Sequence, residues 1–277
     1  MSCPVIVFAN HKGGVGKTTC SVLLSEIIAK KHKKKVLVID CDSQGNTSEA
    51  LSPFGVVPSE LPSLEVCMEN PEKTEYCIIE SWHKNIYFIA NNISMEKPFP
   101  SYTPDKVNLP FIYRVPLDSI AQVVEKTRNK FDFIVIDTAP SLGLTTQSAL
   151  YAADVLFTPC STATHAIFGL PDILRLSAMV KKIEAYVVIT LIDRRTNMDK
   201  IGRNKLMSQF PCIGEVPKVN RIAENLYTKK YLLNKVPKEK VDVIEDLVEN
   251  MLSTAQNIVN MSNDVITATE SVKAAEV

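Results

Sequence analysis

Short apolar runs recur along the chain, and most are followed by a stretch with helical periodicity. Six of these runs are rich in branched apolar residues; they occupy residues 5–9, 36–41, 86–90, 131–137, 155–159 and 185–192. Most are continuously apolar rather than alternating, which is typical of strands buried on both faces. The pattern therefore predicts a largely parallel β-sheet.

Helical patterns lie between these strands, near residues 17–31, 117–129, 143–152, 167–182 and 200–210. Such alternation predicts an α/β fold, with a predominantly parallel, twisted β-sheet flanked by helices on both faces. Apolar residues at helical spacing between 244 and 259 predict an amphipathic helix over about 240–262. Its apolar stripe is expected to pack on the sheet, a partner contact being the alternative, and the last dozen residues are expected to fray.

One stretch breaks this rhythm. Nine of the 16 prolines fall between Pro53 and Pro116. We expect residues 91–116 to form a long irregular, proline-rich insertion on the surface of a single domain that spans 1–277. Loops of that length are usually functional or mobile. A tolerated insertion without a role stays open as the alternative.

The segment "ANHKGGVGKTTC" (9–20) follows the first predicted strand and opens the first predicted helix. Gly16-Lys17-Thr18 is the ending of a phosphate-binding loop, although His11 stands where the motif G-x-x-x-x-G-K-[ST] has its first glycine. A dinucleotide-binding turn is the competing interpretation, but it needs a third glycine at the position of Thr19. Strand, glycine loop and helix in this order favour the phosphate loop.

This loop predicts how a nucleotide is held. Glycines let backbone N–H groups curl around phosphate oxygens, and the following helix directs its positive end to the same place. Lys17 is expected to neutralise the β- and γ-phosphates, and the Thr18 hydroxyl to bind Mg²⁺. The predicted nucleotide-binding residues of the loop are Gly13, Gly14, Val15, Gly16, Lys17, Thr18 and Thr19.

Two further predicted strands end in aspartate. "VLVIDCD" carries Asp40 and Asp42, and "FIVID" ends at Asp137, in the form of a Walker B carboxylate. Because the carboxyl ends of parallel strands meet at one edge of a sheet, we expect these groups to lie together at the ligand. Buried carboxylates are costly unless they hold a cation or are well hydrogen-bonded. The alternative is that each aspartate merely caps a turn.

Three segments together resemble a known family. "KGGVGKTT", "VLVIDCDSQGN" and "FDFIVIDTAPSLG" are similar to the signature segments of the ParA/MinD family of deviant-Walker ATPases, in the family's order. "LIDRRTN" (191–197) and "VPKVNRIAEN" (216–225) resemble the ParA, DNA-partitioning branch. The resemblance covers most of the chain except 53–115. It implies a P-loop NTPase fold of the deviant Walker A, SIMIBI-like kind, with ATP and Mg²⁺ as cofactors.

The resemblance also assigns roles to residues of this chain. It implies that Lys12 reaches across an ATP-sandwich homodimer to the partner's nucleotide, as an arginine finger does. Asp42 would position the attacking water, Asp40 would sit near Mg²⁺ through water, and Asp137 would serve the metal with Thr18. The resemblance further implies that 138–146 would sense the γ-phosphate and that Pro217 and Lys218 would contact adenine. Departures from the family pattern occur at His11, Ser43, Ala139 and Val219, and the last weakens the adenine assignment.

Charge is unevenly distributed, although the chain has 31 basic and 31 acidic residues. Residues 181–240 carry 14 Lys/Arg against six Asp/Glu, whereas 241–277 carry one lysine against seven acids. Such a basic face binds phosphate backbones without reading sequence. Arg195 and Arg221 match arginines that the ParA branch uses for non-specific DNA, and Arg203 and Lys205 are weaker candidates. A solvated helix face is the alternative, and it is preferred for the lysines at 30–35, which follow a helix end.

Composition excludes some settings. No stretch approaches the roughly 18–20 consecutive apolar residues that cross a bilayer, and the N-terminus has no secretory pattern. Seven scattered cysteines without a C-x-x-C spacing indicate reduced thiols. We therefore expect a cytoplasmic, nucleoid-associated protein with no membrane contact.

Together these features predict a Mg²⁺-dependent ATPase that is slow without its partner. It would dimerise with ATP, bind non-specific DNA, and be released when a ParB-like centromere-binding protein stimulates hydrolysis, so that a plasmid or chromosome is segregated. Three alternatives stay open. A MinD-like membrane ATPase needs a basic C-terminal helix, whereas 241–277 is acidic. An iron–sulfur reductase needs a second cysteine to accompany Cys160. A small-molecule synthetase needs a second substrate pocket.

Overall fold

The computed structural model describes residues 3–91 and 116–275, with side chains described up to residue 264. In this part of the chain eight strands form one sheet, in the order β3-β4-β2-β5-β1-β6-β7-β8. All neighbouring strands are parallel except β3 and β4. The strands are β1 (Val5–Phe8), β2 (Val36–Cys41), β3 (Ile78–Glu80), β4 (Ile86–Ile89), β5 (Phe133–Thr138), β6 (Val155–Ser161), β7 (Glu184–Ile192) and β8 (Cys212–Pro217).

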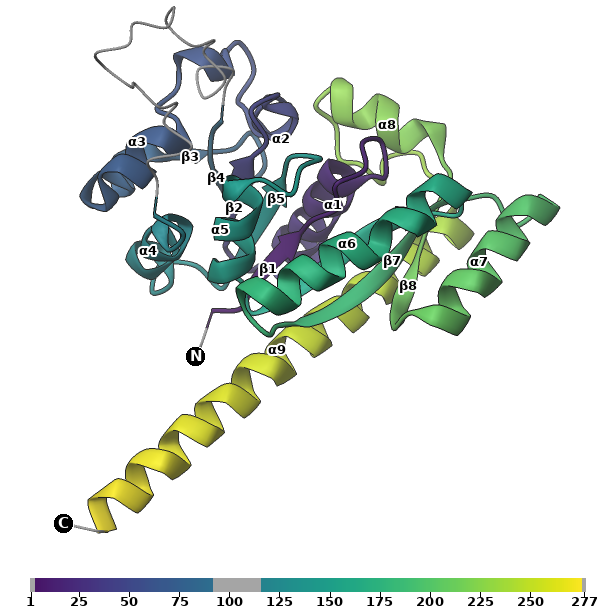
Figure 1. Cartoon of the computed structure of the whole chain (residues 1–277). Helices are drawn as coiled ribbons and strands as arrows, with labels where there is room; N and C mark the ends of the chain where they lie inside the picture. Colours follow the sequence, from purple (N-terminus) through teal and green to yellow (C-terminus); the bar gives the residue numbers. More distant parts are fainter. Residues whose placement is uncertain (1–2, 92–115, 276–277) are drawn as a thin grey trace, which may run out of the picture.

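Helices cover both faces of the sheet (Figure 1). They are α1 (Lys17–Lys31), α2 (Asn46–Leu51), α3 (Leu64–Glu69), α4 (Ser119–Thr127), α5 (Leu144–Ala152), α6 (Thr164–Val180), α7 (Asn197–Gln209), α8 (Asn220–Tyr227) and α9 (Lys238–Ala275). Three short 3-10 turns, Pro58–Glu60, Pro71–Lys73 and Glu75–Cys77, lie before β3. The predicted α/β class with a mostly parallel sheet is therefore confirmed.

The strands are continuously apolar because each face of the sheet has its own core. Ile6 and Phe8 of β1 pack with α1 and α9 on one face, whereas Val5 and Val7 pack with α3, α4 and α5 on the other. Successive side chains of a strand point to opposite faces, so a strand between two helical layers needs apolar residues at every position. A third cluster joins α6 and α7 to β7.

The six predicted strands and five predicted internal helices are all present, with ends that differ by a few residues. Two strands were missed. β3 has only three residues, and β8 reads "CIGEVP", where a glycine and an acid interrupt the apolar run. Gly214 is required there because α9 crosses β8 closely: a Cβ on it would lie 2.8 Å from Leu247 Cδ1.

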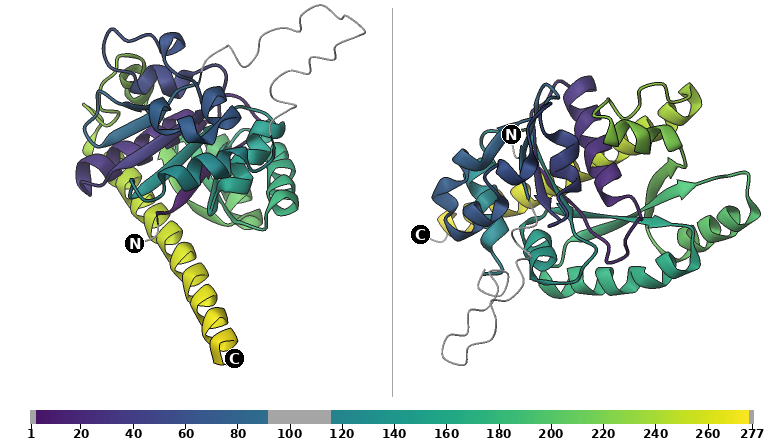
Figure 2. Two further views of the ribbon diagram at one scale, coloured as in Figure 1. Left: turned by 90° about the vertical axis from the view of Figure 1, so that its left-hand side faces the viewer. Right: turned by 90° about the horizontal axis from the view of Figure 1, so that it is seen from above.

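The C-terminal helix is longer than predicted. α9 runs from Lys238 to Ala275 rather than over about 240–262. Its last fully packed side chain is Val259, and residues 260–264 are exposed. The helix continues because 260–275 contain neither glycine nor proline. Its C-terminal part projects beyond the rest of the molecule in Figure 1 and in the left view of Figure 2.

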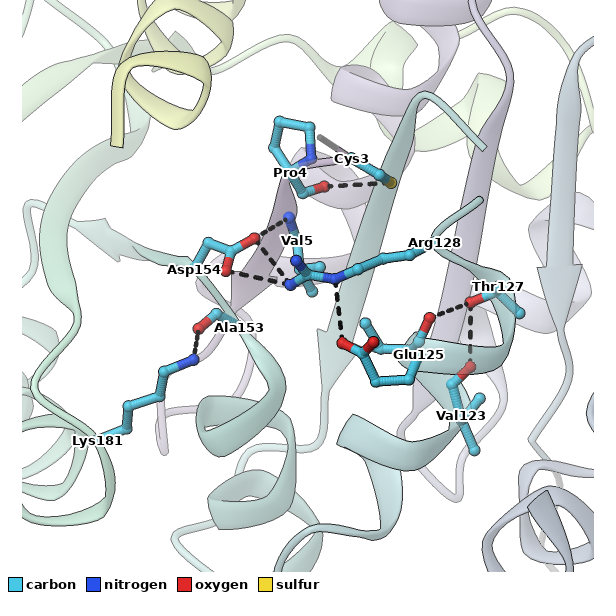
Figure 3. Close-up of polar contacts among 11 residues, drawn as sticks. Cys3, Pro4, Val5, Val123, Glu125, Thr127, Arg128, Ala153, Asp154 and Lys181 are labelled. Atoms are coloured by element: carbon cyan, nitrogen blue, oxygen red, sulfur yellow. Dashed lines mark hydrogen bonds and ion pairs between the residues drawn. The ribbon is translucent and has the colours of Figure 1, made fainter. Parts of the chain in front are cut away.

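The amino end of β1 is fixed by a polar cluster (Figure 3). Asp154 accepts a hydrogen bond from the Val5 N–H at 2.9 Å and ion-pairs with Arg128 at 3.2 Å. Lys181 Nζ donates to the Ala153 carbonyl at 2.8 Å, and burial lowers the pKa of this lysine. The cluster sets the position of β1 and therefore of the loop that follows it.

The proline-rich segment expected at 91–116 lies, from 92 to 115, outside the described residues. Among the residues that the structure describes, no helix has the length and hydrophobicity needed to cross a membrane.

Candidate nucleotide-binding site

The loop between β1 and α1 is held by glycines and by β7. Gly14 (φ 71°) and Gly16 (φ 91°) lie in the left-handed region, where a side chain is strained. Thr190 at the end of β7 donates from Oγ1 to the Val15 carbonyl at 2.7 Å. Its methyl group also lies 3.7 Å from the Cβ position of Gly16, so the loop rests on β7.

Asn10, which the sequence analysis did not single out, fixes the first half of the loop. The side chain is fully buried. Its Nδ2 donates to the Pro159 carbonyl of β6 at 2.8 Å, and its Oδ1 accepts from the Lys12 N–H at 3.0 Å. One buried amide therefore ties the lysine-bearing loop to the neighbouring strand.

Lys17 lies inside the loop and lines a cavity that the loop borders. Its Nζ donates to the Lys12 carbonyl at 3.2 Å, which closes the loop on itself. Burial lowers the pKa of Lys17, while Asp137 and Asp42 act in the opposite direction. Phosphate oxygens would replace the solvation that this buried ammonium has lost.

Lys12 points elsewhere. It does not line the cavity that Lys17 lines. Its Cε and Cγ lie 2.7 Å and 3.1 Å from the position that a Cβ on Gly169 of α6 would occupy. His11 also lies against Gly169, and its Nε2 lies 3.8 Å from an Asp172 carboxylate oxygen. The two lysines of the loop thus serve different places.

Asp137 is the centre of a buried hydroxyl cluster. Thr18 and Thr47 donate to its Oδ2 at 2.7 Å and 2.6 Å, and Ser21 donates to its Oδ1 at 3.2 Å. The sequence predicted the Thr18–Asp137 pairing but not Thr47 and Ser21. Burial raises the pKa of Asp137, and the Thr47 hydrogen bond opposes that rise.

Asp40 is the direct neighbour of Asp137 in the β2–β5 register. Its Oδ2 accepts from the Ser48 N–H and hydroxyl at 2.8 Å and 2.7 Å, and its Oδ1 accepts from the Asp42 N–H at 3.0 Å. Burial, with the nearby Asp137 charge, raises the pKa of Asp40 to about 8. In this state both oxygens order the segment between β2 and α2.

The predicted metal ligands fit a Mg²⁺ site. Thr18 and Asp137 bring a hydroxyl and a carboxylate together, and Asp40 lies beside them. Such hard oxygen donors suit Mg²⁺, which takes one or two protein ligands and completes its shell with phosphate and water. A bound cation would also relieve the repulsion between Asp40 and Asp137.

The cavity has a volume of about 400 Å³, within the range of small-ligand sites. Its lining residues are Gly13, Gly14, Gly16, Lys17, Thr18, Thr19, Asp42, Gln44, Asn46, Glu49, Ala50, Pro140, Leu191, Leu226 and Tyr227. Lys17 and the glycines mark a phosphate end. Asp42, proposed from the sequence to position water, opens on the same cavity, as does Pro140 of the predicted γ-phosphate sensor. Thus most of the predicted nucleotide residues meet in one place.

The apolar part of the cavity lining differs from the prediction. Leu191, Leu226 and Tyr227 line the cavity, whereas Pro217 and Lys218 do not. Pro217 is nevertheless the register partner of Ile192, next to Leu191. Leu191 has φ 56° at an irregularity in the β7–β8 ladder. No motif marked Leu226 or Tyr227, because they enter the cavity only through the placement of α8.

The four DNA candidates have different environments. Arg195 is 89% exposed and binds its neighbour Asp193, and Arg221 is half-exposed beside Glu224. Lys205 lies over the Phe168 ring at 4.8 Å. Arg203 is instead half-buried in an ion pair with Glu215. Arg195 and Arg221 are therefore more exposed to solvent than Arg203.

Comparison with known proteins agrees with the site. Residues 3–191 match a family described as an AAA domain. The chain is 31% identical to the sporulation initiation inhibitor protein Soj of Bacillus subtilis, over 70% of this chain and 75% of Soj. It is 27% identical to the chromosome partitioning protein ParA of Caulobacter vibrioides, over 74% and 76% of the two chains.

Solved structures show the same fold. A putative plasmid partition protein from Borrelia burgdorferi bound to AMPPNP superposes with a TM-score of 0.72 at 21% identity, covering 91% of this chain and 99% of that one. The cell division ATPase MinD of Pyrococcus furiosus superposes with a TM-score of 0.71 at 18% identity, with the same coverage. With the phosphate loop, the paired aspartates and these likenesses in hand, the chain belongs to the ParA/MinD family of P-loop ATPases, near the ParA branch.

Proposed function

We propose that this protein is a ParA-type DNA-partitioning ATPase whose ATP-bound form is a sandwich homodimer. The observation that carries the proposal is the divergence of the two loop lysines. Lys17 faces its own cavity, whereas Lys12 lies against Gly169 of α6, outside that cavity. A lysine that cannot serve its own nucleotide from this position is available for the nucleotide of a second copy.

The described residues divide the work of hydrolysis. Lys17 and the loop N–H groups bind the β- and γ-phosphates, and Asp42, which lines the same cavity, orients the attacking water. Thr18 and Asp137, with Asp40 behind them, hold Mg²⁺, which supplies charge neutralisation to the phosphates when bound. Lys12 of the partner copy adds a cation as charge develops on the transferred group.

ATP binding and dimerisation are then one event, and hydrolysis reverses it. Loss of the γ-phosphate removes the group that the two copies share, so the interface loosens. Hydrolysis is expected to be slow until a ParB-like centromere-binding protein stimulates it. The Soj and ParA names of two relatives support this partition setting.

DNA is the proposed surface on which the dimer acts. Arg195 and Arg221 follow β7 and β8, the strands at one edge of the sheet. Both are at least half-exposed, and both match arginines of the ParA branch. Binding would neutralise phosphates without reading sequence. We therefore propose a cytoplasmic, nucleoid-associated protein that helps to segregate a plasmid or chromosome.

The test is binding to a non-specific DNA duplex with ATP, with ADP and without nucleotide. The variants are Lys12→Ala, Lys17→Ala and, as a control for the loss of a lysine, Lys84→Ala, which removes an exposed side chain. We expect wild type and the control to bind DNA only with ATP. Lys12→Ala should keep ATP binding but lose DNA binding, and Lys17→Ala should lose both. Equal DNA binding in every nucleotide state would contradict the proposed switch.

A further inference from the structure

The nucleotide cavity contains an acid that phosphate and metal chemistry leave unexplained. Of the two acidic residues that line it, Asp42 belongs to the carboxylate group at the strand ends. Glu49 lies on α2, away from that group. A carboxylate facing a cavity for a polyanion is repelled by the ligand unless a cation balances it or the ligand donates to it. We therefore ask which cation lies beside Glu49 and which group of the ligand could donate a hydrogen bond to it.

The cation is Lys229, in the segment that follows α8. Its Nζ lies 3.3 Å from Glu49 Oε1. Only 13% of the Lys229 side chain is exposed, against 62% for Glu49. Lysine is rarely so covered, so the side chain is held in place rather than free in solvent. The ion pair links α2 to the segment that follows α8.

That segment is itself rigidly built. Lys229 has φ 48°, in the left-handed region that a lysine adopts only at a cost. The buried Asn225 holds the turn: its Nδ2 donates to the carbonyls of Leu232 and Asn234 at 3.0 Å and 2.8 Å. Leu232 in turn donates its N–H to the buried Glu26 of α1 at 2.7 Å. Lys229 is therefore presented to Glu49 by a strained turn that hydrogen bonds from Asn225 and to Glu26 hold in place.

The position of Glu49 along the cavity indicates which part of a nucleotide it faces. Asn46 and Glu49 both line the cavity and are one helical turn apart, about 4.5 Å along the helix axis. Thr47, next to Asn46, donates to Asp137 beside Thr18 of the phosphate loop, whereas Glu49 pairs with Lys229, two residues beyond Tyr227. Glu49 thus lies between the phosphate loop and the end of α8, and the ribose of a nucleoside triphosphate lies between its phosphates and its base.

The chemistry of the carboxylate then selects the contact. An ionised glutamate only accepts hydrogen bonds. The groups of ATP that donate are the two ribose hydroxyls and the adenine amino group, and the level of Glu49 on α2 corresponds to the hydroxyls. We propose that Glu49, oriented by Lys229, accepts hydrogen bonds from the ribose hydroxyls and makes this ATPase selective for ribonucleotides over deoxyribonucleotides. The inference rests on the proposed ATP site, and it adds a specificity residue to it.

The experiment measures Mg²⁺-dependent affinity for ATP, 2′-deoxy-ATP, 3′-deoxy-ATP and inosine triphosphate. It compares wild type with Glu49→Gln, Glu49→Ala and Lys229→Met, the last of which keeps the apolar stem. Glu72→Gln is the matched control, because Glu72 forms a surface ion pair with Lys126 at 2.5 Å and does not line the cavity. Circular dichroism of each variant verifies folding.

Wild type and the control should prefer ATP over at least one deoxy analogue by about tenfold, the value of a hydrogen bond to a charged acceptor. Glu49→Ala should bind ATP and its deoxy analogues about equally. Glu49→Gln, whose amide oxygen still accepts a hydrogen bond, should keep part of the preference, and Lys229→Met should lose part of it. If wild type binds ATP, 2′-deoxy-ATP and 3′-deoxy-ATP equally, the inference is overturned and the ATPase proposal still stands. A preference that Glu49 changes only for inosine triphosphate would place Glu49 at the base and also overturn it. Absence of ATP binding by wild type would instead overturn the proposed function.

Discussion

Glu26 is a carboxylate buried in α1, outside the nucleotide cavity. Its Oε1 lies 2.9 Å from His83 Nε2, and its Oε2 accepts from the Leu232 N–H at 2.7 Å. Burial raises the pKa of Glu26, and the hydrogen bond with His83 opposes the rise without cancelling it. A buried side chain that holds α1, the residues before β4 and the turn before α9 together is thus also a titrating group.

A pH dependence follows from the direction of that shift. The folded state binds the Glu26 proton more tightly than the unfolded chain does, so folding stability falls as pH rises above the ordinary glutamate pKa of about 4.3. Glu26→Gln removes this titration and keeps an acceptor for Leu232. We expect its free energy of unfolding, relative to wild type, to increase between pH 5 and pH 8. Urea unfolding at both pH values measures this difference.

The control for this measurement is Glu75→Gln. Glu75 pairs with Lys130 on the surface, where its side chain is 80% exposed. Its substitution should change stability little, and by nearly the same amount at both pH values. A Glu26→Gln difference that stays flat or declines with pH would contradict the assignment.

Single residues of the site were predictable where the signal is local. Gly16, Lys17 and Thr18 stand together in the chain, and Asp40 and Asp137 each end a recognisable strand. Thr47 and Thr190 were not predictable, because their partners Asp137 and Val15 are 90 and 175 residues away. Hydroxyls and amides of this kind have no periodicity or spacing that marks them before the fold brings them together.

At the scale of elements, α7 depends on one close approach. Gly202 faces the residue after β6, and a Cβ on it would lie 2.3 Å from the Thr162 carbonyl oxygen. Thr162 also forms a hydrogen bond with Asp199 at the start of α7. Because the obstacle is backbone, it cannot rotate away as a side chain would.

Gly202→Ala therefore tests packing against helix propensity. Alanine is the better helix former by about 1 kcal/mol, yet the clash requires α7 to move. We expect a net loss of about 1–3 kcal/mol in the free energy of unfolding, the usual cost of overpacking. Asn204→Ala, on the exposed side of the same helix, should be neutral or slightly stabilising. Urea denaturation of both variants compares them, and a stabilised Gly202→Ala would show that α7 is not tightly seated.

Burial and contacts between elements explain which elements could be predicted from the sequence. Strands in the middle of the sheet are recognisable because both of their faces are buried. β8 lies at the edge, and its Gly214 is set by the crossing of α9 rather than by strand propensity. The extent of α9 beyond about residue 262 was also missed, because the prediction followed the apolar stripe and not the absence of a helix-breaking residue.

At the scale of the whole molecule, charge rather than packing separates the two ends of the sequence. The excess of basic residues over 181–240 lies on β7, α7, β8, α8 and the turns between them, and α9 carries the acidic excess. Several cations are already paired, notably Arg203 with Glu215 and Lys229 with Glu49. The surface available to DNA is therefore smaller than the count of lysines and arginines implies.

Arg195 is the position where this argument is sharpest. Its Nη2 lies 2.6 Å from an Asp193 carboxylate oxygen, and this contact holds the pKa of Asp193 below its usual range. The arginine is 89% exposed, so a DNA phosphate can compete for it. Asp193→Asn removes the competitor and should strengthen ATP-dependent DNA binding. Arg195→Ala should weaken binding and lower the slope of log affinity against log salt by about one.

Fluorescence anisotropy of a labelled duplex over a series of salt concentrations measures both effects. Lys130→Ala, which removes the cation of the surface pair with Glu75, is the control and should leave the slope unchanged. If the slope responds to Lys130 as it does to Arg195, binding reflects the overall charge of the chain. If the slope responds to Arg195→Ala alone and the affinity for DNA rises with Asp193→Asn, the loop after β7 contacts the DNA backbone. The ion pair within that loop then sets how tightly the dimer holds DNA.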